Sequence, residues 1–356
     1  GEALRDAGSG VFELAPAGAD GQDLGNAPKE MEWMKRLSAT IQRPVTFALL
    51  QNETEPSLWK QLLEESLEAT EQGSQCFPQV AGRPFGLLIG LQTHHAFAKR
   101  PTFITIAHLP HNELVEQLKQ SSTRNAILTE TDTDPDPKIL FDGMSRMIQS
   151  MLHRLYPMGE IPDYEPDPTK SFVSIAETKN TTPEAVLYDY MLENDGYAMG
   201  MMPIFNYVDG NHDVIREMLL HPQAVSGLSD GGAHCGMICD ASIPTFMLSH
   251  WTRDRTRGKK LPLEWIIKKQ TNDTASLYGL NDRGTLQVGK RADINVIDYN
   301  ALTLHGPKMA HDLPAGGRRL LQEATGYDYT IVAGTITRQF GQDTGQRPGR
   351  LIRGAR

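Results

Sequence analysis

Short apolar runs alternate with longer amphipathic segments in the first part of the chain. The runs at 10–16, 44–50 and 75–81 are compact and mostly apolar, as strands buried in a parallel sheet are. Between the first two runs, apolar residues recur at helical spacing from Met31 to Ile41. This alternation predicts an α/β protein whose strands form a parallel sheet or barrel.

Residues 85–222 do not follow this alternation. The stretch is rich in Pro, Met, Asp and His, and its pattern predicts helices around 112–128, 138–153 and 182–195. We interpret it as an insertion between core strands, and an insertion of this size is usually functional and often covers a site.

The core pattern resumes with a strand at 224–229. Helices are expected near 241–253 and 262–279, because apolar residues again recur at three- and four-residue spacing. Beyond Arg283 the pattern changes to short strands separated by Gly turns, which predicts a small β-rich unit. Its expected strands are 284–288, 292–299 and 329–337.

Composition excludes several classes of protein. The 35 Lys and Arg residues stand against 44 Asp and Glu residues, a net charge of −9 with no basic block of the kind that binds nucleic acid. The longest apolar run, Phe85 to Leu91, is too short to cross a membrane. Three cysteines cannot form a disulfide framework in so long a chain. We therefore expect a cytoplasmic protein with a small-molecule substrate and neither nucleic acid nor membrane as partner.

Asp230 is the strongest candidate for a catalytic residue. It ends the strand at 224–229 and is followed by two glycines, and reactive groups of barrel enzymes occupy such strand ends. The alternative is an Asp that merely caps the loop after the strand. Arg83 follows another strand end, where its guanidinium could pair with a substrate carboxylate or form an ordinary surface or interface ion pair.

Three further groups of side chains are candidates for binding. His95, in the pair His94-His95, is expected to face the substrate, with a solvated turn as the alternative. His234 follows Asp230 by four residues and is either a substrate contact, a partner of a metal ligand or a loop histidine. His234 and its neighbour Cys235, together with Cys239, have the residue types of a soft-metal site, although such cysteines more often pack as small apolar groups.

Three motifs together resemble one known family. They are Ser229-Asp-Gly-Gly-Ala-His, Asp282-Arg-Gly-Thr-Leu-Gln-Val-Gly-Lys-Arg-Ala-Asp-Ile and Thr344-Gly-Gln-Arg-Pro-Gly-Arg-Leu-Ile-Arg-Gly. The chain resembles the amidohydrolase superfamily, and more narrowly its third family, which includes the N-acyl-D-amino-acid deacylases. The similarity extends over essentially the whole sequence.

The resemblance implies a (β/α)₈ barrel with a small β-sandwich. The four predicted strands would be the fifth to eighth of the barrel, and the first four have no counterpart here. Residues 1–282 would then be the C-terminal half of the barrel, with the insertion at 85–222 included. Residues 283–356 would be part of the sandwich and a C-terminal tail.

The resemblance also implies a zinc-dependent reaction in which Asp230 binds the ion and shuttles the proton. Better-known deacylases carry a metal-binding histidine at the end of the fifth and sixth strands, whereas Val11–Leu14 and Phe47–Gln51 contain none. We therefore expect one Zn²⁺, with an incomplete set of ligands in this chain.

The leading hypothesis is hydrolysis of a non-peptide C–N bond in an N-acyl-D-amino acid or a related small amide. One alternative is a cyclic-amide hydrolase of the dihydroorotase or hydantoinase type. Another is a catalytically inactive, truncated amidohydrolase fragment. The two unpaired edges of half a barrel would also favour association into a homo-oligomer.

Overall fold

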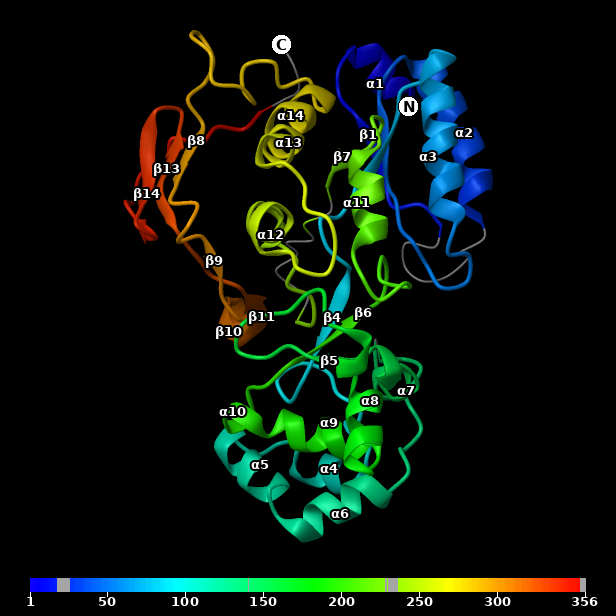
Figure 1. Cartoon of the computed structure of the whole chain (residues 1–356), viewed down its shortest axis with the longest axis vertical. Coiled ribbons are helices and arrows are strands. Elements are labelled where there is room, and N and C mark those ends of the chain that lie inside the picture. Colours follow the sequence, from blue (N-terminus) through cyan, green and yellow to red (C-terminus); the bar gives the residue numbers. More distant parts are fainter. Residues whose placement is uncertain (18–25, 140, 228, 230–235, 353–356) are drawn as a thin grey trace.

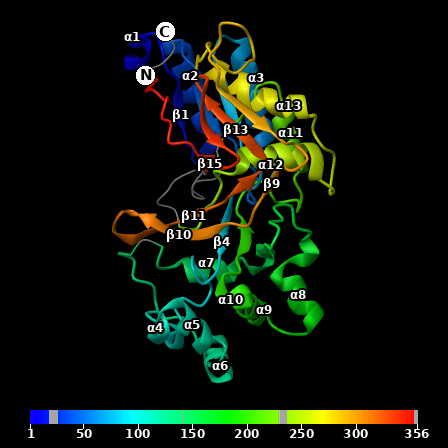
Figure 2. The ribbon, with the colours of Figure 1, turned by 90° about the vertical axis from the view of Figure 1, so that its left-hand side faces the viewer.

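The computed structural model describes residues 1–17, 26–139, 141–227, 229 and 236–352. A four-stranded parallel sheet and its helices form one lobe, and the insertion forms a second lobe beside it (Figure 1). The small β-rich unit flanks the first lobe (Figure 2). The α/β class predicted from the sequence is confirmed.

The parallel sheet has the strand order β1, β2, β3, β7, so neighbours in the sheet follow the order of the chain. All four positions of β2 are buried, as expected for a strand that is covered on both faces. Each strand falls inside one of the four predicted runs. The bounds are β1 (Phe12–Leu14), β2 (Val45–Ala48), β3 (Cys76–Val80) and β7 (Val225–Ser226). The sheet is open among the described residues, and its interpretation as half a barrel stays a prediction.

Amphipathic helices cover this sheet with their apolar stripes. Met31 and Met34 of one helix and Leu62 and Leu63 of the next belong to the same buried cluster as Phe47 of the sheet. Burial of such side chains contributes about 1.5–3 kcal/mol each. The helices of this lobe before the strand β7 are α1 (Glu2–Ala7), α2 (Ala27–Ile41), α3 (Leu58–Glu71) and α11 (Asp213–Leu220).

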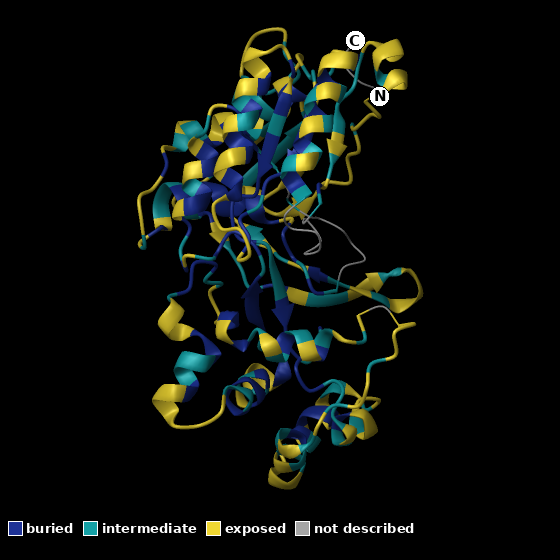
Figure 3. Cartoon of the chain, turned by 90° about the vertical axis from the view of Figure 1, so that its right-hand side faces the viewer, coloured by how far each residue is buried: buried dark blue, intermediate teal, exposed yellow. Residues whose placement is uncertain are grey.

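The insertion has its own sheet and its own apolar core. Its antiparallel strands, in the order β4, β6, β5, are β4 (Gly86–Ile89), β6 (Gly200–Pro203) and β5 (Tyr156–Pro157). A second cluster of buried residues, separate from the first, includes Phe97 and Phe172. Figure 3 shows buried positions concentrated in the strands of both lobes and exposed positions on the outer sides of the helices.

The helices of the insertion are shorter than the sequence pattern predicts. The expected helix over 112–128 is divided in two, because Gln120 adopts an extended conformation with φ −71° and ψ 131°. The observed helices are α4 (Pro101–Ile106), α5 (His111–Leu118), α6 (Ser121–Thr129), α7 (Met144–Ser150), α8 (Phe172–Lys179), α9 (Pro183–Met191) and α10 (Glu193–Gly196).

Both helices expected after β7 are present, and each contains a π-helical turn. The first turn, His250–Asp254, continues α12, and the second, Lys269–Asp273, joins α13 to α14. Such wider turns within helices often occur at functional sites. The regular helices are α12 (Ile243–Ser249), α13 (Leu263–Lys268) and α14 (Thr274–Leu277).

The β-rich unit lacks the strand expected at 284–288. Gly284 and Gly289 have φ of 87° and 88°, a left-handed conformation that ends regular pairing, and Val288 between them is fully exposed. The strands are β8 (Ile294–Ile297), β9 (Thr303–Leu304), β10 (Lys308–Leu313), β11 (Gly317–Leu321), β12 (Ala324–Thr325), β13 (Tyr327–Val332), β14 (Thr335–Gln339) and β15 (Gln342–Asp343). The division of the chain at residue 282 and the sandwich architecture stay predictions. Over the described residues, no helix is both long and apolar enough to span a lipid bilayer.

Candidate functional site

Polar side chains on and after the first three parallel strands are bound to one another. Glu13 of β1 accepts hydrogen bonds from Gln79 of β3 at 2.9 Å and from the Tyr278 hydroxyl at 2.8 Å. Gln51, which follows β2, donates from its side chain to Asp209 at 3.1 Å and from its backbone to Asn206 at 2.7 Å. Of these groups only the carboxylates of Glu13 and Asp209 are of a type that binds zinc, and no histidine or cysteine is among them. Among the described residues, no group of three metal-binding side chains gathers at these strand ends.

Arg83 lies after β3 and is buried, with 1% of its side chain exposed. Its Nε and Nη2 donate to Asp240 at 3.3 and 2.9 Å, and Nη2 also donates to the Cys239 carbonyl at 2.6 Å. The guanidinium lies over the Tyr164 ring, 3.7 Å from its centroid. Of the two interpretations of Arg83, the structure shows an ion pair, buried within the fold.

The Nη1 group of Arg83 has no hydrogen-bond partner in the part of the chain that the structure describes. Arg83 lines a cavity of about 10 Å³ together with Tyr164 and Leu88. A cavity of this size holds about one water molecule. The predicted contact between Arg83 and a substrate carboxylate is not tested.

Two of the four predicted site residues, Asp230 and His234, lie outside the described residues, as does Cys235. His95 lies in the core of the insertion, where its ring packs edge-on against Phe103 at 4.5 Å and its Nδ1 accepts from the Phe97 backbone at 3.2 Å. Burial, together with a smaller effect of His94, lowers the pKa of His95 to about 3. A substrate contact of His95 stays a prediction.

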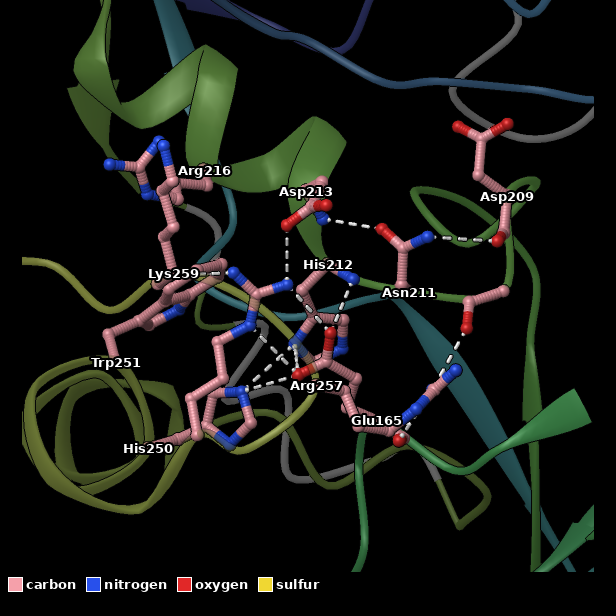
Figure 4. A network of polar contacts seen from close by, with 12 residues as sticks. Glu165, Asp209, Asn211, His212, Asp213, Arg216, His250, Trp251, Arg257 and Lys259 are labelled. Carbon is pink, nitrogen blue, oxygen red and sulfur yellow. Dashed lines mark hydrogen bonds and ion pairs between the residues drawn. The ribbon is translucent and has the colours of Figure 1, made fainter.

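A second set of polar side chains, Glu165, His212 and His250, meets between the lobes; we call it the Glu165 cluster (Figure 4). Glu165 follows β5 in a loop of the insertion, His212 immediately precedes α11, and His250 begins the π-helical turn after α12. The Nε2 of His250 lies 3.1 Å from Oε2 of Glu165 and 3.2 Å from Nδ1 of His212. Three segments that are far apart in the sequence therefore supply one compact group.

The hydrogen bonds assign the tautomer of His212. Its Nε2 lies 2.8 Å from the Tyr164 carbonyl, which can only accept, so Nε2 carries the proton and Nδ1 presents a lone pair. The His250 Nε2–H group then points between this lone pair and Glu165. Burial lowers the pKa of His212 to about 3, so the ring is neutral near pH 7.

Arg255 pairs with the carboxylate of Glu165. Its Nε donates to Oε2 at 3.0 Å and its Nη2 donates to Oε1 at 2.8 Å, while the His212 backbone N–H also donates to Oε1 at 2.7 Å. Burial alone would raise the pKa of Glu165, but the hydrogen bonds from His250 and Arg255 outweigh it and hold this pKa far below its usual range. Glu165 is therefore a carboxylate near pH 7.

A cleft of about 440 Å³ opens beside this cluster. Glu165 and His250 line it, and His250 keeps 15% of its side chain exposed. The remaining lining is mostly charged: Asp163, Asp167, Thr169, Lys170, Asp254, Thr256 and Arg257. The arrangement joins a buried carboxylate and two imidazoles to a polar cleft of small-molecule size.

Residues 2–338 match the protein-family model described as "Amidohydrolase family". The chain belongs to the amidohydrolase family. No curated protein sequence matches it. The resemblance inferred from the three motifs is confirmed.

Solved structures of similar fold come from enzymes of this kind. A D-aminoacylase with a binuclear metal centre has 17% identity and a TM-score of 0.50, and the match covers 99% of this amidohydrolase chain and 57% of the D-aminoacylase. The N-acyl-D-glutamate deacylase of Bordetella bronchiseptica, solved with zinc and a phosphonate inhibitor, has 16% identity and a TM-score of 0.45, with 92% and 53% covered. This chain therefore spans little more than half the length of the structures it matches.

The Glu165 cluster was missed in the sequence analysis. One local signal was present, because His212 stands in the polar run Asn211-His212-Asp213 directly before an amphipathic helix. Glu165 and His250 lie 47 and 38 residues from it along the chain, and no spacing rule connects residues so far apart.

Proposed function

We propose that this amidohydrolase hydrolyses the amide bond of N-acyl-D-amino acids, with Asp230 as the proton shuttle. The observation that carries the proposal is the family match over residues 2–338, which includes the strand β7 and the Asp230 motif directly after it. Structural likeness to a D-aminoacylase at 17% identity supports the fold that would hold such a site.

The proton transfer assigned to Asp230 has two steps. Its carboxylate takes a proton from the attacking water, and the resulting acid then gives that proton to the nitrogen of the departing amine. The amide C–N bond breaks, and one water is consumed to yield a carboxylic acid and an amine. Such a positioned acid–base group typically contributes about 10²–10⁴-fold to the rate.

Zinc, when bound in enzymes of this class, lowers the pKa of its water and polarises the carbonyl. Gln51 is not one of the residue types that bind zinc, and Glu13 belongs to no group of three metal-binding side chains among the described residues. The proposed hydrolysis therefore includes no step at a zinc ion bound by Glu13 or Gln51. Asp230 remains our proposed ligand at the strand ends.

We propose that Arg83, His95 and His234 bind the substrate. The Nη1 group of Arg83, which has no partner among the described residues, is the donor left over for a carboxylate or for a water that bridges to one. His234 and His95 are proposed as further substrate contacts, the first because it follows Asp230 by four residues.

The test is hydrolysis by the full chain supplied with zinc, assayed as release of free D-amino acid from N-acetyl-D-amino acids and their L-enantiomers. Asp230→Asn should lower the rate by about 10²–10⁴-fold. The matched control is Asp282→Asn, since Asp282 is exposed and pairs only with Arg283 in the described structure. Unchanged hydrolysis in Asp230→Asn would refute the shuttle.

The two alternatives give different results in the same assay. A cyclic-amide hydrolase would open hydantoin or dihydroorotate faster than it releases D-amino acids. A chain with no hydrolysis of either substrate class in the presence of zinc would be the inactive fragment.

A further inference from the structure

We propose that Glu165, His212 and His250 bind a divalent cation of the zinc type, at a site separate from the strand ends. The proposal does not depend on the hydrolytic function given above. The three ligand atoms would be Oε2 of Glu165, Nδ1 of His212 and Nε2 of His250.

The distances between these atoms are those of a tetrahedral site. With bonds of about 2.0–2.1 Å to nitrogen and oxygen, neighbouring ligand atoms in a tetrahedron lie about 3.3 Å apart. The three separations here are 3.1 Å, 3.2 Å and, between His212 Nδ1 and Glu165 Oε2, 3.7 Å. An ion could therefore replace the His250 Nε2 proton with little movement of the side chains.

The rings are already oriented for an ion. His212 donates its other ring proton to the Tyr164 carbonyl, which is how metal-binding histidines are usually held. His250 stacks on Phe246, with ring centroids 4.4 Å apart and an interplanar angle of 15°. Since these contacts fix both rings, little side-chain entropy would be lost on binding.

Arg255 is the main argument against an ion, because its positive charge lies beside the same carboxylate. It is also 2.8 Å from Asp213, which offsets part of that charge. A carboxylate oxygen has two lone-pair directions, and on Oε2 Arg255 uses one while the other faces His250. With the acidic residues of the cleft and their ion-pair partners included, five carboxylates stand against four cationic side chains: Asp163, Glu165, Asp167, Asp213 and Asp254 against Lys170, Arg253, Arg255 and Arg257.

Three protein ligands leave a fourth position open, and Glu165 and His250 line the cleft of about 440 Å³. Structural zinc sites are closed by four protein ligands, whereas sites that bind water or substrate keep one position open. The π-helical turn that begins at His250 is a further feature common at functional sites. The geometry therefore points to an ion whose fourth ligand comes from the cleft.

The test is titration of the chelator-treated full chain with Co²⁺, a coloured substitute for zinc, followed by visible absorption and by direct metal analysis. His250→Gln should bind one cobalt fewer per chain, with an affinity at the cluster reduced at least about 100-fold, since loss of an outer partner alone typically costs 10–100-fold. His250 is partly exposed, so this variant is preferred to changes at the buried Glu165. His108→Gln is the matched control, because His108 is exposed.

Five outcomes decide the proposal. Loss of one cobalt in His250→Gln but not in His108→Gln supports it. Equal binding by His250→Gln and the unaltered chain overturns it, as does the absence of any bound cobalt. Loss of cobalt in Asp230→Asn alone places the ion at the strand end, which overturns the proposal but leaves the proposed function intact. Cobalt binding lost in His250→Gln, with hydrolysis unchanged in Asp230→Asn, supports the cluster and refutes the shuttle.

Discussion

Two buried arginines, Arg83 and Arg255, pair with carboxylates in different parts of the molecule. Arg83 lies behind the parallel sheet with Asp240, and Arg255 lies between the lobes with Glu165. Each guanidinium also lies over an aromatic ring, 3.7 Å from the centroid of Tyr164 for Arg83 and 4.8 Å from that of the Trp251 ring for Arg255. In composition the two environments are alike.

They differ in how completely the guanidinium is paired. Arg255 uses all three of its nitrogens, because Nη1 donates to the Lys259 carbonyl at 2.8 Å in addition to its contacts with Glu165 and Asp213. Arg83 leaves Nη1 without a partner among the described residues, and Arg83 also lines a water-sized cavity. A fully paired buried cation stabilises a fold, whereas an unused donor at a cavity is available to water or a ligand.

The largest effect on stability is expected from Arg255→Met. This change leaves the Glu165 carboxylate buried without its cation, and breaking a buried pair in this way typically costs about 3–5 kcal/mol. Urea denaturation followed by circular dichroism would measure the loss in the free energy of unfolding. A loss below about 1 kcal/mol would show that the pair is not a main support of this region.

Arg83→Met should cost less, about 2–3 kcal/mol. The change removes one partner of the buried Asp240 carboxylate, and it also removes the unpaired Nη1 group, whose burial itself costs about 1–3 kcal/mol. The same denaturation experiment compares the two variants directly. If Arg83→Met were the more destabilising of the two, the unpaired donor would have to be satisfied in solution, and the contrast between the arginines would fail.

The sequence predicts the region around Arg83 better than the region around Arg255. All four parallel strands lie within the predicted runs, because apolar runs of strand length are a local signal that tertiary packing preserves. Arg83 was selected for the same reason, as the polar residue after a strand. Its partner Asp240 lies 157 residues away and has no local signal.

The region around Arg255 could not be predicted in the same way. Glu165, His212 and Arg255 come together only because the insertion packs against the segment after α12, over separations of 47 and 90 residues. Neither segment has a periodic pattern that indicates its partner. The π-helical turn at His250 is equally hidden, since its residues fit a continuous helix.

Protonation of His95 would create a buried cation without a carboxylate partner among the described residues. Arg83 and Arg255, in contrast, each have such a partner. Because its pKa falls from 6.5 in the unfolded chain to about 3 in the folded chain, the unfolded state binds the proton first as the pH falls. The free energy of unfolding should therefore decrease below about pH 6.5, by roughly 1.4 kcal/mol per pH unit from this residue and about 2 kcal/mol by pH 5.

The measurement is denaturation of the unaltered chain and of His95→Gln between pH 7 and pH 5. The Gln variant loses a hydrogen bond and is less stable at pH 7. Its free energy of unfolding should change less with pH, because it lacks the one proton that the unfolded chain takes up at His95. His108→Gln, at an exposed histidine, should keep the slope of the unaltered chain. An unchanged slope in His95→Gln would mean that His95 is not held neutral in the core.

The smallest effect is expected at an exposed pair with the same forked geometry as Arg255 and Glu165. Arg124 donates from Nε and Nη2 to the two oxygens of Asp189 at 2.7 and 2.8 Å, but 58% of the Asp189 side chain is exposed. Water solvates both charges when this pair is broken, so Arg124→Met should cost less than about 1 kcal/mol. Denaturation of Arg124→Met beside Arg255→Met isolates burial as the variable, because both the substitution and the hydrogen-bond geometry are matched. A cost equal to that of Arg255→Met would mean that the forked contact itself, and not its removal from water, makes the pair at Glu165 important.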